Sequence, residues 1–570
     1  MADDRSDRLL NLIERKPTSD RLLLRILFFT VIASGLVFAL SLNSQFISET
    51  PTSGGVLEEG VIGTPRFVNP VLAVTRADQD MTALVYSGLL EVSPEGDLVP
   101  DVAESVTVSE DGRTYNIVVR QDVRFHDGVQ LTARDVAYTI ALIQNPDLKS
   151  PLRGNWNGVL VEELGEYELN VVLEEAYSPF IENFTFGILP RHIWDELPIE
   201  QLPFSQHNTE PIGSGPFQIS EVERNRSGLI NTYTLSQFPD LPDPARLDRV
   251  VVRFYENEAD VDEALMAGEI TSSANLTSGT VRTLNENDYT VTQTTLPRTF
   301  GIFFNQNRSI VTRDLDVREA LNAAIDREML IEDVLLGYGV PATGPVPNGF
   351  LRETLATSSA TVSTSSLEAA RAILIAAGWE EAEDSTWQTE IDDIEYTLSV
   401  TLRTANTPLF EATANAVADR WRELGVLVNV EQFEQADLLQ AVIRPREFEA
   451  LLFGTDLSRA VDLFPFWHSS QKDDPGLNIA QYANIEADAF LETARVSQDE
   501  EEVEAALQAV DELIQAEVPA LFLFSPVLTY VTSNEFTLPT LSKLSRPHER
   551  FMNIENWHAK TGALWPFFNE

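Results

Sequence analysis

Residues 84–140 read LVYSGLLEVSPEGDLVPDVAESVTVSEDGRTYNIVVRQDVRFHDGVQLTARDVAYTI, and this stretch decides the fold class. Within it, TYNIVVR at 114–120 alternates apolar and polar residues, which is typical of a half-buried strand. Thr132 can then cap a helix over ARDVAYTIALI at 133–143. Further outward, YELNVVL at 167–173 predicts another strand. Short strands that alternate with amphipathic helices predict a mixed α/β fold.

Two helices are expected in the second half of the chain. The first covers VREALNAAIDREMLIEDVLLG at 317–337, with Asp316 as its cap and Gly337 at its end. The second, LFEATANAVADRWRELG at 409–425, leads directly into the predicted strand VLVNVEQF, as in a βαβ crossover. Trp421 on this helix is interpreted as a core residue.

Composition limits the function. The 570-residue chain has 40 Lys and Arg against 89 Asp and Glu, a net charge of −49 at pH 7. Such a surface repels phosphate backbones, so nucleic acid is excluded as a partner. The chain has no cysteine, which rules out disulfides, thiolate nucleophiles and lipid attachment through a cysteine thioether. The length exceeds the usual domain of about 100–150 residues, so more than one core is expected.

An uncharged stretch near the N-terminus, ILFFTVIASGLVFALSL at 26–42, reaches the lower limit of about 17 residues for a membrane-spanning helix. No basic residue follows it before Arg66, so the positive-inside rule predicts a cytoplasmic N-terminus and an extracytoplasmic remainder. The basic residues that precede it are Arg5, Arg8, Arg15, Lys16, Arg21 and Arg25.

Two other interpretations of this stretch stay open. It could be a cleaved signal peptide, for which Ala39 and Ser41 supply small residues at suitable spacing, or a buried core helix. The long charged leader favours an uncleaved anchor. The linker SETPTSGG at 48–55 separates this anchor from the rest of the chain.

Beyond the linker, four blocks resemble family 5 extracellular solute-binding proteins, which include oligopeptide, dipeptide and nickel receptors of ABC importers. The first is the stretch at 84–140. The others are PIGSGPFQI at 211–219, FNQNRSIVTRDLDVREALNAAIDREMLIEDVLLGYGVPATGPVP at 304–347 and VPALFLFSP at 518–526. Ser214 stands where the family usually has threonine. The order of the blocks agrees with the family.

The resemblance implies an α/β, bilobal, periplasmic-binding-protein-like fold (type II, cluster C-like), whose hinge-linked lobes close on a ligand. It implies lobe I at 56–297 plus 527–570, with an inserted subdomain at about 80–205, and lobe II at 298–526. In front of these lobes, hydropathy and charge predict a cytoplasmic leader at 1–25, one transmembrane helix as the anchor at 26–42, and a linker at 43–55.

The segment LLFGTDLSRAVDLFPFWHSS at 451–470 resembles the family segment in which an acid pairs with the ligand's α-ammonium group. Asp456 matches that acid, and Asp462 is a rival. The structural alternative for Asp456 is a cap of a local turn. The resemblance therefore predicts these ligand-binding residues: Phe453, Gly454, Thr455, Asp456, Asp462 and Trp467, together with Phe67, Val68 and Asn69, for which an ordinary strand end is the alternative.

Motifs for chemistry are absent from the sequence. His126 and Asp127, followed by Gly128, supply too few ligands for a zinc site and are interpreted as a structural turn. Gly213 and Gly215 are not followed by a phosphate-loop lysine and are also interpreted as a turn. There is no H-E-x-x-H and no G-x-S-x-G, so we expect no catalytic residue, metal or cofactor.

The predicted function is capture of a peptide outside the membrane and its delivery to an ABC permease. The expected partners are the solute, the permease and, through the N-terminal helix, the membrane; the protein itself is expected to be a monomer. A receptor for a nickel chelate, a glycoside or another small solute is the alternative, since fold does not determine ligand. From a different class, an anchored enzyme or scaffold would use the same fold. A titratable pair of perturbed acidity in the cleft would favour the enzyme.

Overall fold

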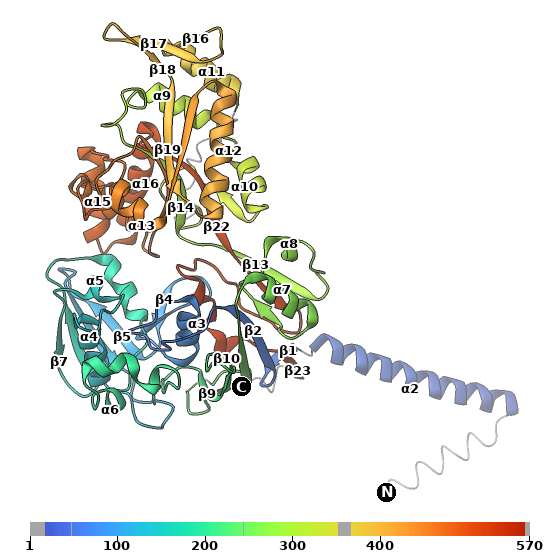
Figure 1. The fold of residues 1–570 in the computed structure, drawn as a ribbon. Coiled ribbons are helices and arrows are strands. Elements are labelled where there is room, and N and C mark those ends of the chain that lie inside the picture. The colour runs from blue at the N-terminus through green and yellow to red at the C-terminus, as the bar shows by residue number, and fades with distance from the viewer. Residues whose placement is uncertain (1–16, 47, 243, 351–365, 565–570) are drawn as a thin grey trace. The chain divides into compact units, whose positions relative to one another are not determined.

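The computed structural model describes residues 17–46, 48–242, 244–350 and 366–564, and Figure 1 traces their course. The chain divides into two compact units, residues 1–54 with 558–570 and residues 55–557. The first unit holds the helix α2 (Thr18–Phe46) and an antiparallel ladder of β1 (Ser48–Thr52) with β23 (Lys560–Leu564).

The predicted transmembrane anchor, residues 26–42, lies within α2. In the described part of the chain, no helix combines the length and the apolar character that a membrane crossing needs, so the structure does not support this prediction. Residues 1–16 of the predicted leader lie outside the described residues.

The second unit is built on one large sheet. Its strands are β2 (Val56–Ile62), β9 (Phe217–Arg224), β10 (Ile230–Gln237), β11 (Arg249–Tyr255), β12 (Ser272–Ser273), β13 (Tyr289–Thr295), β14 (Arg298–Phe304), β15 (Gly339–Pro341), β19 (Ser399–Ala405), β20 (Leu427–Phe433), β21 (Ala450–Asp456) and β22 (Ala520–Ser533). The order is β20-β19-β21-β14-β22-β12-β2-β11-β10-β9, and β13 and β15 also pair with β22. Parallel and antiparallel pairs both occur, as a mixed α/β fold requires.

The strand β22 connects the two ends of this sheet. Its first half pairs with β14 and β15, ending at the pair Gly339 and Pro526. Its second half pairs with β13, beginning at the pair Thr295 and Val527, and with β12. All four pairings are antiparallel. The change of partners therefore falls between two adjacent residues of one continuous strand.

The remaining strands of the second unit form three smaller sheets. They are β3 (Leu90–Val92) with β4 (Leu98–Pro100); β5 (Ala103–Val108), β6 (Thr114–Val119), β8 (Glu168–Val172) and β7 (Leu160–Glu163); and β16 (Glu380–Glu381), β17 (Trp387–Ile391) and β18 (Ile394–Thr397). The strands predicted at 114–120 and 167–173 are β6 and β8, which pair antiparallel. The helix predicted after Thr132 is α4 (Ala133–Gln144), which begins with a capping box between Thr132 and Asp135. These three predictions are confirmed.

The other helices of the first half are α3 (Arg76–Val85), α5 (Arg153–Trp156), α6 (Arg191–Trp194), α7 (Glu258–Ala267), α8 (Ser278–Val281) and the short helices η1 (Ser178–Thr185), η2 (Ile199–Phe204) and η3 (Gln206–Asn208). Those of the second half not discussed below are α11 (Leu367–Ala376), α13 (Gln435–Asp437), η4 (Leu438–Ile443), α14 (Phe464–Trp467), η5 (Ser469–Gln471), α15 (Ile485–Val496) and α16 (Glu500–Glu517).

The single helix expected over residues 317–337 is in fact two, α9 (Leu315–Ala323) and α10 (Arg327–Leu335). The prediction that Asp316 caps it was wrong, because Asp314 accepts a hydrogen bond from the Asp316 backbone N–H at 3.1 Å and is itself the cap. Asp326 accepts from the Met329 N–H at 3.0 Å and starts the second helix.

The helix expected at 409–425 is α12 (Pro408–Leu424), and this prediction is confirmed. Gly425 follows it with a φ of 102°, a conformation that glycine adopts without strain. The chain then enters β20, which lies parallel to β19, so α12 is the crossover of a βαβ unit.

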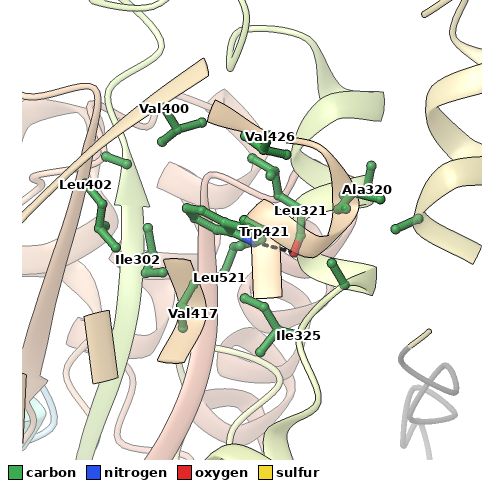
Figure 2. Packing of buried hydrophobic residues seen from close by; sticks show 14 of the residues in the cluster. Ile302, Ala320, Leu321, Ile325, Val400, Leu402, Val417, Trp421, Val426 and Leu521 are labelled. Atoms are coloured by element: carbon green, nitrogen blue, oxygen red, sulfur yellow. Dashed lines mark hydrogen bonds between the residues drawn. The ribbon is translucent and has the colours of Figure 1, made fainter. Parts of the chain in front are cut away.

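Trp421 lies at the centre of the core that α12 forms with the sheet. Its side chain is fully buried, and the indole Nε1–H donates to the Leu321 carbonyl oxygen at 3.0 Å. Figure 2 shows it among Ile302 and Leu402 of the strands and Val417 of its own helix. The interpretation of Trp421 as a core residue is confirmed, and its one polar atom is satisfied.

A fully buried arginine ties the C-terminal segment to the first strand of the large sheet. Arg550 in η6 (Pro547–Phe551) binds both carboxylate oxygens of Asp80 in α3, at 2.7 and 2.8 Å. It also binds a carboxylate oxygen of Glu59 in β2 at 2.9 Å. The Tyr530 hydroxyl of β22 donates to the second oxygen of Glu59 at 2.8 Å. Four distant segments thus share one cluster, which we call the Arg550 cluster.

Charge is balanced inside this cluster by direct contact. Burial would lower the pKa of Arg550, but Asp80 and Glu59 raise it above its ordinary value. Burial would likewise raise the pKa of Asp80, and the Arg550 guanidinium outweighs that effect and lowers it. Both groups therefore stay ionised, and removal of either would leave a buried charge without its partner.

We expect Arg550→Met to lower the free energy of unfolding by about 3–5 kcal/mol, because Asp80 and Glu59 would stay buried without the guanidinium that hydrogen-bonds both of them. Urea denaturation followed by circular dichroism measures this change. The matched control is Arg191→Met, which breaks an ion pair with Asp195 at 3.0 Å whose side chains are about half exposed. That control should cost no more than about 1 kcal/mol. Equal losses in the two variants would contradict the prediction.

Candidate functional site

A cavity of about 750 Å³ lies within the second unit. Its wall is built from segments at residues 70–101, 152–187, 456–466 and 545–555, which are far apart in the sequence. A volume of this size falls in the range of about 300–1,000 Å³ that is typical of ligand sites. We therefore treat this cavity as the candidate site.

One part of the wall, around Tyr86, is positioned by two of the predicted turns. A Cβ at Gly213 would lie 2.0 Å from the Val85 carbonyl oxygen, and one at Gly215 would lie 2.6 Å from the Val85 carbonyl carbon, so only glycine fits. His126 holds this turn: its backbone N–H donates to Gly213 O at 2.8 Å, and its Nε2 lies 3.0 Å from Gly215 O. Burial lowers the pKa of His126 to about 4, so the ring is neutral at pH 7. The structural interpretation of both motifs is confirmed.

Three carboxylates line the wall: Glu91 in β3, Asp101 after β4 and Glu555 in η7 (Ile554–Asn556). Burial raises the pKa of Glu91 well above its usual range, and the negative charges of Asp101 and Glu555 add to this effect. Burial also raises the pKa of Asp101, although Ser87 donates a hydrogen bond to its carboxylate. The cavity thus contains titratable groups of perturbed acidity.

Asp456, the acid predicted to bind the ligand, lines the cavity at the end of β21. Its cross-strand neighbour in β14 is Arg298. The two side chains form an ion pair, with Arg298 Nη2 lying 2.6 Å from Asp456 Oδ2. The Asp456 side chain is 60% exposed, so its carboxylate keeps room for another partner. This geometry differs from the alternative of a turn cap.

Asp462, the rival acid, also lines the cavity but is already well bonded. It accepts from the Tyr177 hydroxyl at 3.0 Å and from the Phe464 backbone N–H at 3.1 Å, and Arg495 lies 3.6 Å from it. Only 10% of its side chain is exposed. Asp462 is therefore held by the protein itself.

Between these two acids in the sequence, Arg459 binds residues from other parts of the chain. Its guanidinium forms an ion pair with Glu549 at 2.5 Å and donates to the carbonyl oxygens of Gly96, at 3.0 Å, and of Lys543. Its backbone N–H donates to Glu182 of η1 at 3.2 Å. Burial raises the pKa of Glu182 to about 7.

The other predicted residues lie behind the wall and not in it. Thr455 is buried and its hydroxyl donates to Thr299 O at 3.3 Å, while Gly454 lies against the Phe300 ring. Phe453 stacks on Phe410, with ring centroids 6.5 Å apart. Trp467 is buried in a hydrophobic core, whereas its neighbours Pro465 and Phe466 do line the cavity.

Phe67, Val68 and Asn69 support the wall from outside it. The Val68 N–H donates to Asn208 O at 2.8 Å, and the Asn69 side chain bonds that of Asn208 at 3.1 Å. The Phe67 N–H donates to Asp78 at 2.8 Å. None of the three lines the cavity, although the next residue, Pro70, does.

Sequence reasoning missed Glu91, Asp101, Glu182, Arg459 and Glu549. The carboxylates carry no motif spacing that distinguishes them in so acidic a chain. Arg459 offered a signal, since it is the only Lys or Arg in the segment 451–470. Among the residues that the structure describes, no group of three His, Cys, Asp or Glu side chains could hold a metal ion.

The chain is similar to known binding proteins. It is 27% identical over 563 residues to the oligopeptide-binding protein AppA of Bacillus subtilis, a match that covers 96% of this chain and 99% of that protein. It is also 28% identical over 271 residues to the nickel-binding periplasmic protein of Escherichia coli, covering 45% and 49% of the two chains.

Solved structures share the fold. The structure of Bacillus subtilis AppA in complex with a nonapeptide is 25% identical, has a TM-score of 0.64, and covers 90% of this chain and 100% of its own. The murein tripeptide binding protein MppA in its unliganded open form gives a TM-score of 0.74 at 17% identity, covering 90% and 98% of the two chains. These likenesses confirm the predicted α/β binding-protein fold. Residues 97–475 match the family described as bacterial extracellular solute-binding proteins, family 5 middle, and the chain belongs to this family.

Proposed function

We propose that this protein captures peptides outside the cytoplasmic membrane and delivers them to an ABC permease. The observation that carries the proposal is a ligand-sized cavity whose wall carries charged side chains of both signs, among them Asp456, Arg298 and Arg546. A peptide with free ends brings both an ammonium group and a carboxylate, and charge-assisted hydrogen bonds would hold each end. Relatives named for binding oligopeptides support this choice.

A receptor explains the site better than an enzyme does. The perturbed pair Glu91 and Asp101 meets one condition for acid–base catalysis. Acid–base catalysis also needs a reacting group within hydrogen-bond reach of the pair. The Ser87 hydroxyl is the neighbour that bonds Asp101, and a peptide bond to be cleaved would have to lie beside it. The family of this chain is named for solute binding. Cleavage of a bound peptide during incubation, seen by mass spectrometry, would favour the enzyme.

We also propose two lobes, residues 56–297 with 527–570 and residues 298–526, that close on the ligand. Support comes from β22, whose partners change between Pro526 and Val527. Closure around a cavity would bury the ligand and its charged contacts.

Saturation with peptide should therefore reduce the radius of gyration in small-angle scattering, because two hinged lobes become more compact when they close. Protein without peptide at the same concentration is the control. An unchanged radius with saturating peptide, shown bound by calorimetry, would contradict closure.

The N-terminal segment is the proposed membrane attachment. Support comes from the uncharged stretch at 26–42 and from apolar side chains on α2, including Phe28, Phe29 and Phe38, that are more than three-fifths exposed. The full chain should sediment with membranes, and a variant that starts at Gly54 should stay in the supernatant. N-terminal sequencing of the mature protein provides the control. A new N-terminus close to residue 42 would show a cleaved signal peptide instead.

We expect Asp456→Asn to weaken peptide binding about thirtyfold or more, because a charge pair that the bound ligand buries is worth about 2–5 kcal/mol. The melting temperature of the empty protein should stay the same, since the exposed pair with Arg298 contributes little to folding. Isothermal calorimetry with free and N-acetylated peptides tests the role: the wild type should discriminate between them, and the variant should not.

Asp462→Asn is the matched control for this experiment. It removes the carboxylate that Tyr177 and Arg495 contact, so it should lower stability more than Asp456→Asn does. It should preserve discrimination between free and acetylated peptides. If Asp462→Asn abolished that discrimination and Asp456→Asn preserved it, Asp462 would be the ammonium ligand.

A further inference from the structure

A short segment of lobe II, residues 457–463 after β21, is bonded to lobe I. Arg459 supplies most of these bonds. Its guanidinium forms an ion pair with Glu549 at 2.5 Å and donates hydrogen bonds to the carbonyl oxygens of Gly96, at 3.0 Å, and of Lys543. All three partners belong to lobe I, and they come from distant parts of the sequence. One side chain therefore joins two separate stretches of lobe I to lobe II.

The backbone of the same segment is bonded to η1 of lobe I. The Arg459 and Ala460 N–H groups donate to the two carboxylate oxygens of Glu182, the first at 3.2 Å. The Tyr177 hydroxyl, one residue before η1, donates to Asp462 at 3.0 Å. The contact between the lobes is therefore a network of bonds along the whole segment.

The ion pair in this network is shielded from water. The side chain of Arg459 is 11% exposed and that of Glu549 is 9% exposed. Water screens the attraction between two charges, so the pair is stronger inside the protein than in solvent. The two carbonyl oxygens that also accept from the guanidinium offset the loss of its hydration. If the lobes separated where the partners of β22 change, Arg459 would leave all three acceptors and both ions would return to water.

We propose that Arg459 and its acceptors Glu549, Gly96 and Lys543 form a latch, the Arg459 latch, that holds the lobes together after they close on a peptide. These hydrogen bonds go to the protein and not to the ligand, so the latch strengthens the binding of every peptide by the same factor. A closed form that the protein's own contacts stabilise binds its ligand more tightly, because closure then costs less of the binding free energy. This inference rests on the proposed function and on the two proposed lobes.

Arg459→Met should weaken the binding of different peptides by the same factor, at least about tenfold, because the closed form loses a shielded charge pair. Calorimetry of the full chain with alanine tripeptides that carry Leu, Glu or Lys at the central position measures this factor. Stopped-flow mixing should show the loss in the dissociation rate and not in the association rate, since the latch forms after the peptide has entered. The melting temperature of the empty protein should stay the same, because the open form does not contain the latch.

Glu549→Gln is a second variant of the same pair. Its amide oxygen can still accept from the Ser545 backbone N–H, which lies 2.6 Å from the Glu549 carboxylate, so the variant removes the charge and keeps this bond. It should also weaken the three peptides equally. Combining it with Arg459→Met should cost little more than Arg459→Met alone, because the pair is already broken.

Arg403→Met is the matched control. It breaks an ion pair of 2.8 Å with Glu431, which joins the neighbouring strands β19 and β20 within lobe II. Arg403 lies outside the cavity wall that the structure describes. This variant should bind the three peptides as tightly as the wild type does.

Unequal losses among the three peptides in Arg459→Met, or a loss that disappears when their C-terminal carboxylates are amidated, would overturn the latch, because Arg459 would then contact the ligand. Wild-type affinities in this variant would overturn it too. So would a melting temperature that falls as much in the empty protein as in the peptide-saturated protein. Failure of the wild type to bind any peptide would instead overturn the proposed function, and binding without a change in the radius of gyration would overturn the closing lobes.

Discussion

The Arg550 cluster is the constraint on which much of the second unit depends. One guanidinium satisfies carboxylates from the first strand and from α3, and a hydroxyl from β22 completes the set. Because each charge is fully buried, none of these segments can move away alone without leaving an unpaired ion. The chain therefore has to bring its two ends together before this part of the sheet is stable.

The Arg550 cluster also positions a residue of the cavity wall. Arg550 faces the interior, whereas the preceding residue, Glu549, binds Arg459 in the wall. The ion pairs of Arg550 hold η6 in place, so the adjacent Glu549 side chain lies at a defined position in the cavity wall. Rigid support of this kind lowers the entropy that a binding group loses when a ligand arrives. Fold stability and the wall of the cavity consequently depend on one segment.

Local sequence patterns predicted several strands and helices correctly. Features that depend on contacts between distant residues could not be predicted from the sequence. The strands β6 and β8 and the helices α4 and α12 follow from alternation, capping and a terminal glycine, which are properties of neighbouring residues. The break between α9 and α10 was missed because Asp326 competes as a cap inside an apolar helical pattern. Asp456 was expected from its segment to face a cleft, and it lines the cavity, while its role in binding stays a prediction. The raised pKa of Glu91 could not be expected in this way, because it depends on burial and on Asp101 and Glu555, which are far from Glu91 or from each other in the sequence.

The distance along the chain between the partners of the Arg550 cluster also sets an order of events during synthesis. Glu59 precedes Arg550 by 491 residues. At about 5–20 residues per second, a ribosome needs roughly 25–100 s to travel from one to the other. Throughout that interval the nascent first strand and α3 carry carboxylates whose hydrogen-bonded counterion, Arg550, has not yet been made. They stay hydrated, which opposes premature collapse, and the cluster that fixes the first strand is completed only after residue 550 has been translated.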